Sequence, residues 1–347
     1  MKNTAILFAG LLLAATSASA HHSSAGRYDS RSLTEIEGVI TAIRWRNPHA
    51  HLMVLVTDEN GQEIEWEVEG AGVTTLARSG LRESLFQVGD RVRVAGWSPV
   101  TARREMFMQN VLLSSGEEFV TWPSASVRWS EESRGDFAFW SQNEGDRSRP
   151  EAGIFRVWSS SFALPGLFNL SRLDTNAFPL TEAGLARVEA FEAAGENLVT
   201  TQGCKPKGIP LIMEQPYPME FVRAGDDIEL HIEEYDAVRR IRMGVDASAG
   251  ENVPPGPFGF STGRWEGDTL VVTTTRLNWP LLNQSGAPLS EEVVLEERFT
   301  PLEQGSLLDY QLTVTDPLMY TAPVERGKQW LYLPGQEVRP YDCTESL

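Results

Sequence analysis

The sequence is poor in the side chains and motifs that most often mark enzyme chemistry. It contains two cysteines and five histidines among 347 residues. Neither Cys204 nor Cys343 belongs to a CxxC pair or has a histidine close to it in the sequence, which disfavours a metal site built on cysteine. The sequence has no nucleophile elbow, because its GxSxG match, "GFSTG" at 259–263, falls on a predicted strand hairpin, and it has no HExxH or phosphate-binding glycine loop. It therefore gives no support to an enzyme class that depends on one of these motifs.

Basic residues are scarce relative to acidic ones. The chain has 30 Lys and Arg residues against 48 Asp and Glu residues, and its net charge is -18. A chain with this balance repels the phosphates of nucleic acids and the surfaces of anionic membranes. We therefore expect no nucleic-acid partner, and a small molecule or another protein is the expected partner.

Long apolar runs are absent except close to the N-terminus. The run "AILFAGLLLAA" follows Lys2, is too short to span a bilayer, and precedes the small-residue sequence "ASA" that ends at Ala20. This pattern predicts a signal peptide over residues 1–20, and hence a periplasmic or secreted protein with no membrane span. In such an oxidising compartment we expect Cys204 and Cys343 to form a disulfide.

The composition that remains is typical of a β-rich chain, with ten Trp and 20 Pro residues. We predict a mainly β protein, with an OB-like five-stranded barrel followed by a larger antiparallel β-rich domain that is barrel-like or meandering and has one clear helix. The expected divisions are an N-terminal segment (21–31), the OB-like domain (32–122), a connector (123–165) and the C-terminal domain (166–347).

Alternating apolar and polar residues carry the prediction for the first domain. They predict strands at 33–45, 50–58, 62–70, 88–97 and 105–116. A short helix is expected over 71–81, and Asn60-Gly61 is a strong hairpin signal. Three strands, a helix and two strands is the order of an OB-type barrel. Met106 and Met108 alternate on the last strand, where core packing is favoured over copper ligation; Met213 and Met219 are interpreted in the same way.

The second domain is predicted to contain a helix followed mostly by strands. A helix is expected over 180–194, with Thr181 as its cap. Its strands are expected at 219–225, 227–236 and 238–244, and two further pairs turn at 266–268 and near Gly305; one more strand is expected at 153–160, within the connector. Meandering strands of this kind favour an up-and-down sheet or an open barrel.

Several phrases resemble those of exported bacterial families without a known activity. The first domain shows "HHSS", "EGVITAIRWRNPHAHL" and "GDRVRVAGW", which resemble a family with a mature His-His-Ser start and an OB-like domain. The second shows "CKPKGIPLIMEQPYPMEF", "STGRWEGDTLVVTTT" and "TVTDPLMY", which resemble a second exported β-rich group. The resemblance implies export and β architecture, and it implies no catalytic residues.

Histidine supplies the leading functional hypothesis. Four of the five histidines, His21, His22, His49 and His51, fall within 31 residues. If the mature chain begins at His21, its α-amine and imidazole can chelate one metal ion, and two or three such nitrogens suit Cu(II). His49 and His51 are two residues apart, so on a strand they point to the same face. Asp29 is a candidate oxygen ligand.

The alternative hypothesis is that these histidines have a structural role. His21 and His22 then form only a polar mature start, while His49 or His51 caps a strand or bonds a carbonyl. Under this interpretation the protein is a metal-free scaffold that binds a ligand or a partner.

A third hypothesis is a hydrolase acting on a small or carbohydrate substrate, because a carboxylate pair could be hidden among 48 acidic residues. Its densest candidate cluster is Glu233, Glu234 and Asp236 beside His231, for which a solvated strand face is the expected explanation. Trp265, Trp279 and Trp330 either line a ligand cavity or fill cores.

Overall fold

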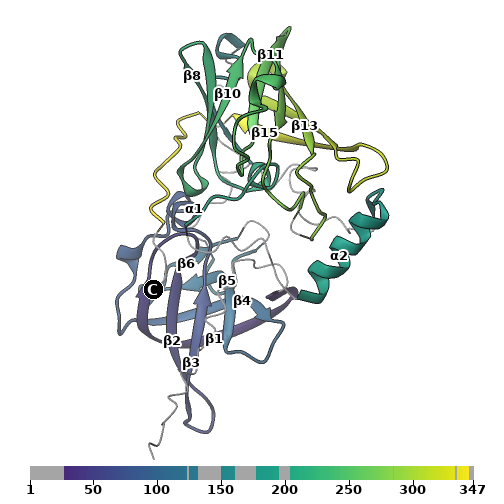
Figure 1. Ribbon diagram of the computed structural model, residues 1–347. Helices are drawn as coiled ribbons and strands as arrows, with labels where there is room; N and C mark the ends of the chain where they lie inside the picture. Colours follow the sequence, from purple (N-terminus) through teal and green to yellow (C-terminus); the bar gives the residue numbers. More distant parts are fainter. Residues whose placement is uncertain are drawn as a thin grey trace, which may run out of the picture.

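The computed structural model describes residues 27–122, 125–131, 150–160, 177–194, 204–283, 285–332 and 334–343. These residues form two β structures, a smaller N-terminal sheet in purple and blue and a larger C-terminal barrel in green and yellow (Figure 1). The mainly β fold expected from the sequence is confirmed. The expected signal peptide, His21, His22 and most of the expected connector lie outside the described residues.

The N-terminal sheet closes on itself through its first five strands. The strands are β1 (Tyr28–Arg44), β2 (His51–Thr57), β3 (Glu63–Glu69), β4 (Arg91–Pro99), β5 (Glu105–Leu112) and β6 (Glu118–Val120). Their order is β3-β2-β1-β4-β5-β6, and β3 also pairs in parallel with β5. This extra pairing makes a ring, β1-β2-β3-β5-β4, which is the five-stranded OB-type arrangement expected from the alternation.

Tight strand crossings explain two glycines in this barrel. A Cβ added to Gly38 in β1 would lie 2.3 Å from the carbonyl oxygen of Leu55, and one added to Gly96 in β4 would lie 2.4 Å from that of Phe107. The β4–β5 register shifts next to Gly96, as is usual where a barrel strand bends. Inside, Met106 and Met108 are buried in the core, which confirms the packing role expected for them.

The helices of the described residues are short, apart from one. They are α1 (Val73–Arg78), η1 (Glu83–Leu85), η3 (Pro150–Ala152), α2 (Glu182–Ala194), η5 (Leu211–Glu214), η6 (Glu234–Asp236), η7 (Ala247–Gly250) and η8 (Glu303–Gly305). The long helix, α2, is the one expected over 180–194. The Gly184 amide donates to Oγ1 of Thr181 at 3.0 Å, so Thr181 caps it as predicted.

The C-terminal strands close into a nine-stranded barrel rather than an open one. They are β7 (Val157–Ser159), β8 (Met219–Ala224), β9 (Asp227–Ile232), β10 (Ala237–Met243), β11 (Phe260–Glu266), β12 (Thr269–Thr275), β13 (Val294–Leu302), β14 (Leu307–Thr315) and β15 (Val324–Tyr332). The ring runs β10-β11-β12-β13-β14-β15-β7-β8-β9. All neighbouring pairs are antiparallel except β10 and β11, which are parallel.

The barrel interior contains a buried ionic layer among its apolar side chains. Arg239 donates from Nη1 to Glu297 at 3.0 Å and from Nη2 to Oγ1 of Thr274 at 2.7 Å. Tyr310 donates from its hydroxyl to Glu297 at 2.9 Å, and Ser261 accepts from Nε of Arg239 at 3.0 Å. The pair Arg239–Glu297 is almost completely buried. Its hydrogen bonds offset the cost of taking two charges out of water.

The C-terminal tail joins the two barrels. Cys343 forms a disulfide with Cys204, with a Cα–Cα distance of 5.7 Å, which confirms the predicted pairing. Cys343 also forms a β-bridge with Asn47 of the N-terminal barrel. The Asn47 side chain donates to the Tyr341 carbonyl, and Tyr341 is fully buried. Arg78 of α1 forms a bidentate ion pair with Glu233, one contact being 2.6 Å.

The structure contains no candidate transmembrane helix, since among the described residues none combines the necessary length and apolarity.

Candidate functional site

His49 and His51 lie beside two carboxylates at the edge of β2 and β3. His51 is the first residue of β2, and His49 precedes it by two residues. Nδ1 of His51 is 2.9 Å from Oε1 of Glu67, and Nδ1 of His49 is 3.3 Å from Oε1 of Glu69. His51 pairs directly with Glu69 across the two strands. The two imidazoles therefore share one patch of the barrel, although His49 lies outside the strand on which the sequence placed it.

Arg27 holds the carboxylates of this patch together. Its guanidinium donates to Glu69 at 3.1 Å and also to Glu105, the first residue of β5. Tyr28 donates from its hydroxyl to Glu69 at 2.8 Å. The pKa of Arg27 is raised: burial opposes the charge, but the hydrogen bond to Glu105 and the charge of Glu69 outweigh it. Glu67, which contacts His51, is the third carboxylate of the patch.

We call the group Arg27, Tyr28, His49, His51, Glu67, Glu69 and Glu105 the histidine–carboxylate cluster. The contact from His51 is the largest cause of the low pKa of Glu67, about 2. The cluster contains three carboxylates and one arginine, Arg27. Arg44 lies outside the cluster, is partly exposed, and contacts Glu67 at 3.0 Å. The negative excess of the cluster favours a bound cation.

In both imidazoles Nδ1 is the ring nitrogen that lies near an acceptor oxygen. Nδ1 of His49 lies 3.0 Å from the carbonyl oxygen of Gly70. Nδ1 of His51 has an ion-pair distance to Glu67, although its angle is not that of a hydrogen bond. Among the described residues, no hydrogen bond engages Nε2 of either ring. The His49 ring is thus held as metal-binding histidines commonly are, with Nδ1 fixed by an acceptor and Nε2 left for the ion.

Burial lowers the pKa of His49, against the opposing charge of Glu69. A lowered pKa keeps the ring neutral at neutral pH, and the neutral ring is the form that binds metals. The bond to Gly70 equally fits the structural interpretation of His49, in which the ring bonds a carbonyl.

The described residues do not complete a metal site by themselves. Within those residues, no three side chains of His, Cys, Asp and Glu converge so as to hold a metal ion. Asp29, a candidate ligand, hydrogen-bonds Arg31 at 3.0 Å instead. Sequence reasoning missed Arg27, Glu67, Glu69 and Glu105. The alternation of "EIEWEVE" places Glu67 and Glu69 on one face, but only the β3–β5 pairing brings Glu105 to them.

The acidic cluster near His231 is not a solvated strand face, so that expectation was wrong. Strand β9 ends at Ile232, and Tyr235 has a positive φ of 58° in the turn that follows. Glu233 and Glu234 are buried, paired with Arg78 and with Lys207 respectively. Glu233 is a structural ion of the contact between the barrels, and Glu234 is paired within the C-terminal part of the chain. His231 itself hydrogen-bonds Glu229 at 3.0 Å.

Of the three candidate tryptophans, Trp265 lines a hollow. Trp330 is buried in the barrel core, and Trp279 packs against Gly208 and Leu211. Trp265 is 43% exposed and lines a pocket of about 420 Å³ with Phe155 and Arg223.

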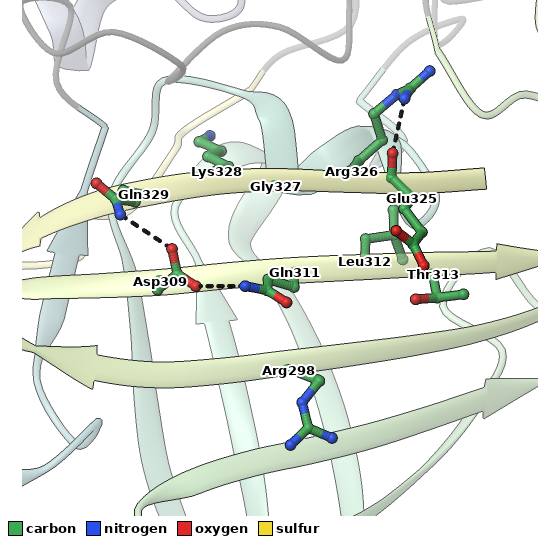
Figure 2. Close-up of a pocket in the computed structure, with 10 residues that line it drawn as sticks. All are labelled: Arg298, Asp309, Gln311, Leu312, Thr313, Glu325, Arg326, Gly327, Lys328 and Gln329. Carbon is green, nitrogen blue, oxygen red and sulfur yellow. Dashed lines mark hydrogen bonds between the residues drawn. The ribbon is translucent and has the colours of Figure 1, made fainter.

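A second hollow is a groove of about 560 Å³ over β13, β14 and β15. Figure 2 shows its polar side chains bonded to one another: Gln329 and Gln311 donate to the two oxygens of Asp309 at 3.1 and 3.2 Å. These mutual bonds reduce what the groove can offer to a ligand.

The structure thus defines a two-barrel β protein with a histidine–carboxylate cluster on its N-terminal barrel. Residues 9–105 match a family of unknown function (DUF6152), which covers the segment from the apolar run to the start of β5. No curated protein matches the chain.

Proposed function

We propose that the chain is an exported, periplasmic or secreted binding protein that holds copper at the histidine–carboxylate cluster. His49 and His51 supply two imidazole Nε2 atoms, and His21, as the first residue after signal cleavage, supplies its α-amine and imidazole. His22 adds a further nitrogen. Such a nitrogen-rich set suits Cu(II).

The position of Arg27 carries this proposal. Arg27 is bound to Glu69 and Glu105, and Glu69 contacts His49. Arg27 is six positions after His21, and six extended Cα-to-Cα steps span at most about 20 Å. A mature N-terminus at His21 is therefore tethered within reach of His49 and His51. The negative excess of the cluster favours the α-amine and the metal ion alike.

The test is a calorimetric titration of Cu(II) into protein whose start at His21 has been checked by intact mass. We expect a Kd below about 1 μM. One residue added before His21 should weaken binding by at least about tenfold, because it displaces the α-amine and leaves every side chain in place. His49→Ala and His51→Ala should each weaken binding by a similar factor.

His231→Ala is the matched control, since His231 lies in the other barrel, where it contacts Glu229, and it should leave the affinity unchanged. Equal affinity of the extended and native forms would show that "HHSS" is only a mature start, and the metal-free scaffold would then be the better hypothesis.

A further inference from the structure

The 420 Å³ hollow, which we call the end pocket, lies at the end of the C-terminal barrel. It is lined by η3 and the residues after it, by the β11–β12 turn, by the β13–β14 turn and by Arg223 of β8. Figure 1 shows this end of the barrel pointing away from the N-terminal sheet. The volume is in the usual range for small-molecule sites, and no residue of the end pocket belongs to the histidine–carboxylate cluster.

Arg223 is the cation of the end pocket. Its guanidinium carbon lies 3.7 Å from the centre of the Phe155 ring, so the flat group stacks on an aromatic face. Among the described residues, no carboxylate lies within ion-pair distance of Arg223, although most other arginines of the two barrels have such a partner. A stacked guanidinium keeps its N–H edge available for a planar carboxylate, which it can bind through two hydrogen bonds.

Acidic side chains line the same pocket. Asp268 lies in the β11–β12 turn and Glu151 lies in η3, and both are exposed. Neither forms an ion pair with Arg223 or with any other described cation. The end pocket therefore presents positive and negative groups that are not neutralised by each other.

An exposed indole completes the lining. Trp265 is 43% exposed, and its ring centre lies 6.2 Å from that of Phe155, at an interplanar angle of 53°. Two aromatic rings at this separation and tilt form an apolar wall that a third ring can join.

From these groups we propose that the end pocket binds a free α-amino acid with an aromatic side chain. The ligand carboxylate pairs with Arg223, its ammonium group pairs with Asp268 and Glu151, and its ring packs against Trp265. A zwitterion matches the two signs of charge in the pocket, whereas a simple carboxylate leaves the two acids without a partner. This site is independent of the proposed copper site.

The test combines ligands that each lack one charged group with protein variants that each lack one side chain of the pocket. L-phenylalanine, N-acetyl-L-phenylalanine and L-phenylalaninamide are titrated calorimetrically into the full mature chain. A metal chelator is present, so that copper held by the histidines cannot capture the amino acid. We expect L-phenylalanine to bind with a Kd below about 1 mM, and each blocked derivative to bind at least about tenfold more weakly.

The variants then assign the two charges. Arg223→Gln should abolish the preference for L-phenylalanine over its amide, and Asp268→Asn should reduce its preference over the N-acetyl form. Trp265→Ala should weaken all three ligands. Arg240→Gln is the matched control, because Arg240 is paired with Asp227 on the barrel surface, and it should change nothing. Circular dichroism melts check that each variant is folded.

Three results would overturn the proposal. The first is no detectable binding of L-phenylalanine at about 10 mM. The second is an unchanged ligand preference in Arg223→Gln. The third is binding of glucose, but not of L-phenylalanine, that is lost in Trp265→Ala, which would make the end pocket a polyol site. Because the chelator removes copper from every measurement, these outcomes do not depend on the fate of the copper proposal.

Discussion

Glu214, at the end of η5, has surroundings that are unusual for a carboxylate. It is buried, and neither of its carboxylate oxygens has a hydrogen-bond partner among the described residues. Burial raises its pKa well above the usual value near 4.5, although the charges of Lys328 and Arg326 oppose the shift. The nearby Lys328 amine donates to the Met213 carbonyl at 2.9 Å, and burial lowers the pKa of Lys328 to about 7.

The raised pKa of Glu214 predicts a measurable pH dependence of stability. The folded protein retains this proton at pH values where the unfolded carboxyl has lost it, so its contribution to stability falls as the pH rises from about 4.5 through the folded pKa. Glu214→Gln should remove that loss. Urea unfolding between about pH 5 and pH 6.5, below the titration of Lys328, should show stability falling less steeply, or rising more, in the variant than in the native protein.

Glu266→Gln is the control for this prediction. Glu266 is exposed, and hydrogen bonds from Arg298 and then Arg264 lower its pKa, so its contribution to stability is lost as the pH falls and not as it rises. Parallel pH profiles for the native protein and Glu214→Gln would contradict the role given to Glu214.

At the scale of elements, the C-terminal tail is held mainly by Cys343 and Tyr341. The Tyr341 ring packs between Tyr217 and Tyr235, at centroid distances of 5.3 and 4.8 Å, and its amide donates to Asp236 at 2.9 Å. The disulfide closes a loop with a sequence separation of 139 residues.

Removing the disulfide should destabilise the protein. The Cys204→Ser, Cys343→Ser double variant should lose about 3–5 kcal/mol of unfolding free energy by the chain-entropy estimate. Thermal unfolding of this variant, and of native protein with and without reductant, measures the effect. Reductant should lower the Tm of the native protein and leave that of the double variant unchanged. A native Tm insensitive to complete reduction would contradict the prediction.

At the scale of the whole molecule, a buried ion pair couples the two barrels. Arg78 of the N-terminal barrel and Glu233 of the C-terminal barrel are both almost fully buried, and Glu233 also accepts from the Arg339 amide of the tail at 3.0 Å. Losing one partner leaves the other charge buried and unpaired, which typically costs about 3–5 kcal/mol.

Arg78→Ala should therefore destabilise the protein by about 3–5 kcal/mol and separate unfolding of the two barrels into distinguishable transitions. Calorimetric unfolding measures both effects. Arg91→Ala is the control, because Arg91 forms an exposed ion pair with Glu37 and should cost less than about 1 kcal/mol. A single unshifted transition in Arg78→Ala would show that the barrels are coupled by other contacts.

Much of the fold was predictable because strand alternation and turn residues act locally. Strands β1 to β5 and β8 to β14, the cap of α2 at Thr181 and the disulfide all follow from patterns within short windows or from two lone cysteines. Strand β15 was missed for a local reason as well. Positions 326 and 328 lie on the same face of this strand as buried Val324 and Trp330, but they carry Arg and Lys. The sequence therefore shows no alternation of apolar residues here.

The sequence by itself determined the β architecture and the disulfide, because the first depends on residues close in the chain and the second on a pairing without alternatives. Only the tertiary structure decided which charges meet. Arg27 reaches Glu69 and Glu105 because the β3–β5 pairing closes the first barrel. Glu233 is buried because the second barrel packs against α1 at Arg78. Charged side chains have no periodicity that encodes their partner, so their partners follow from barrel closure and packing.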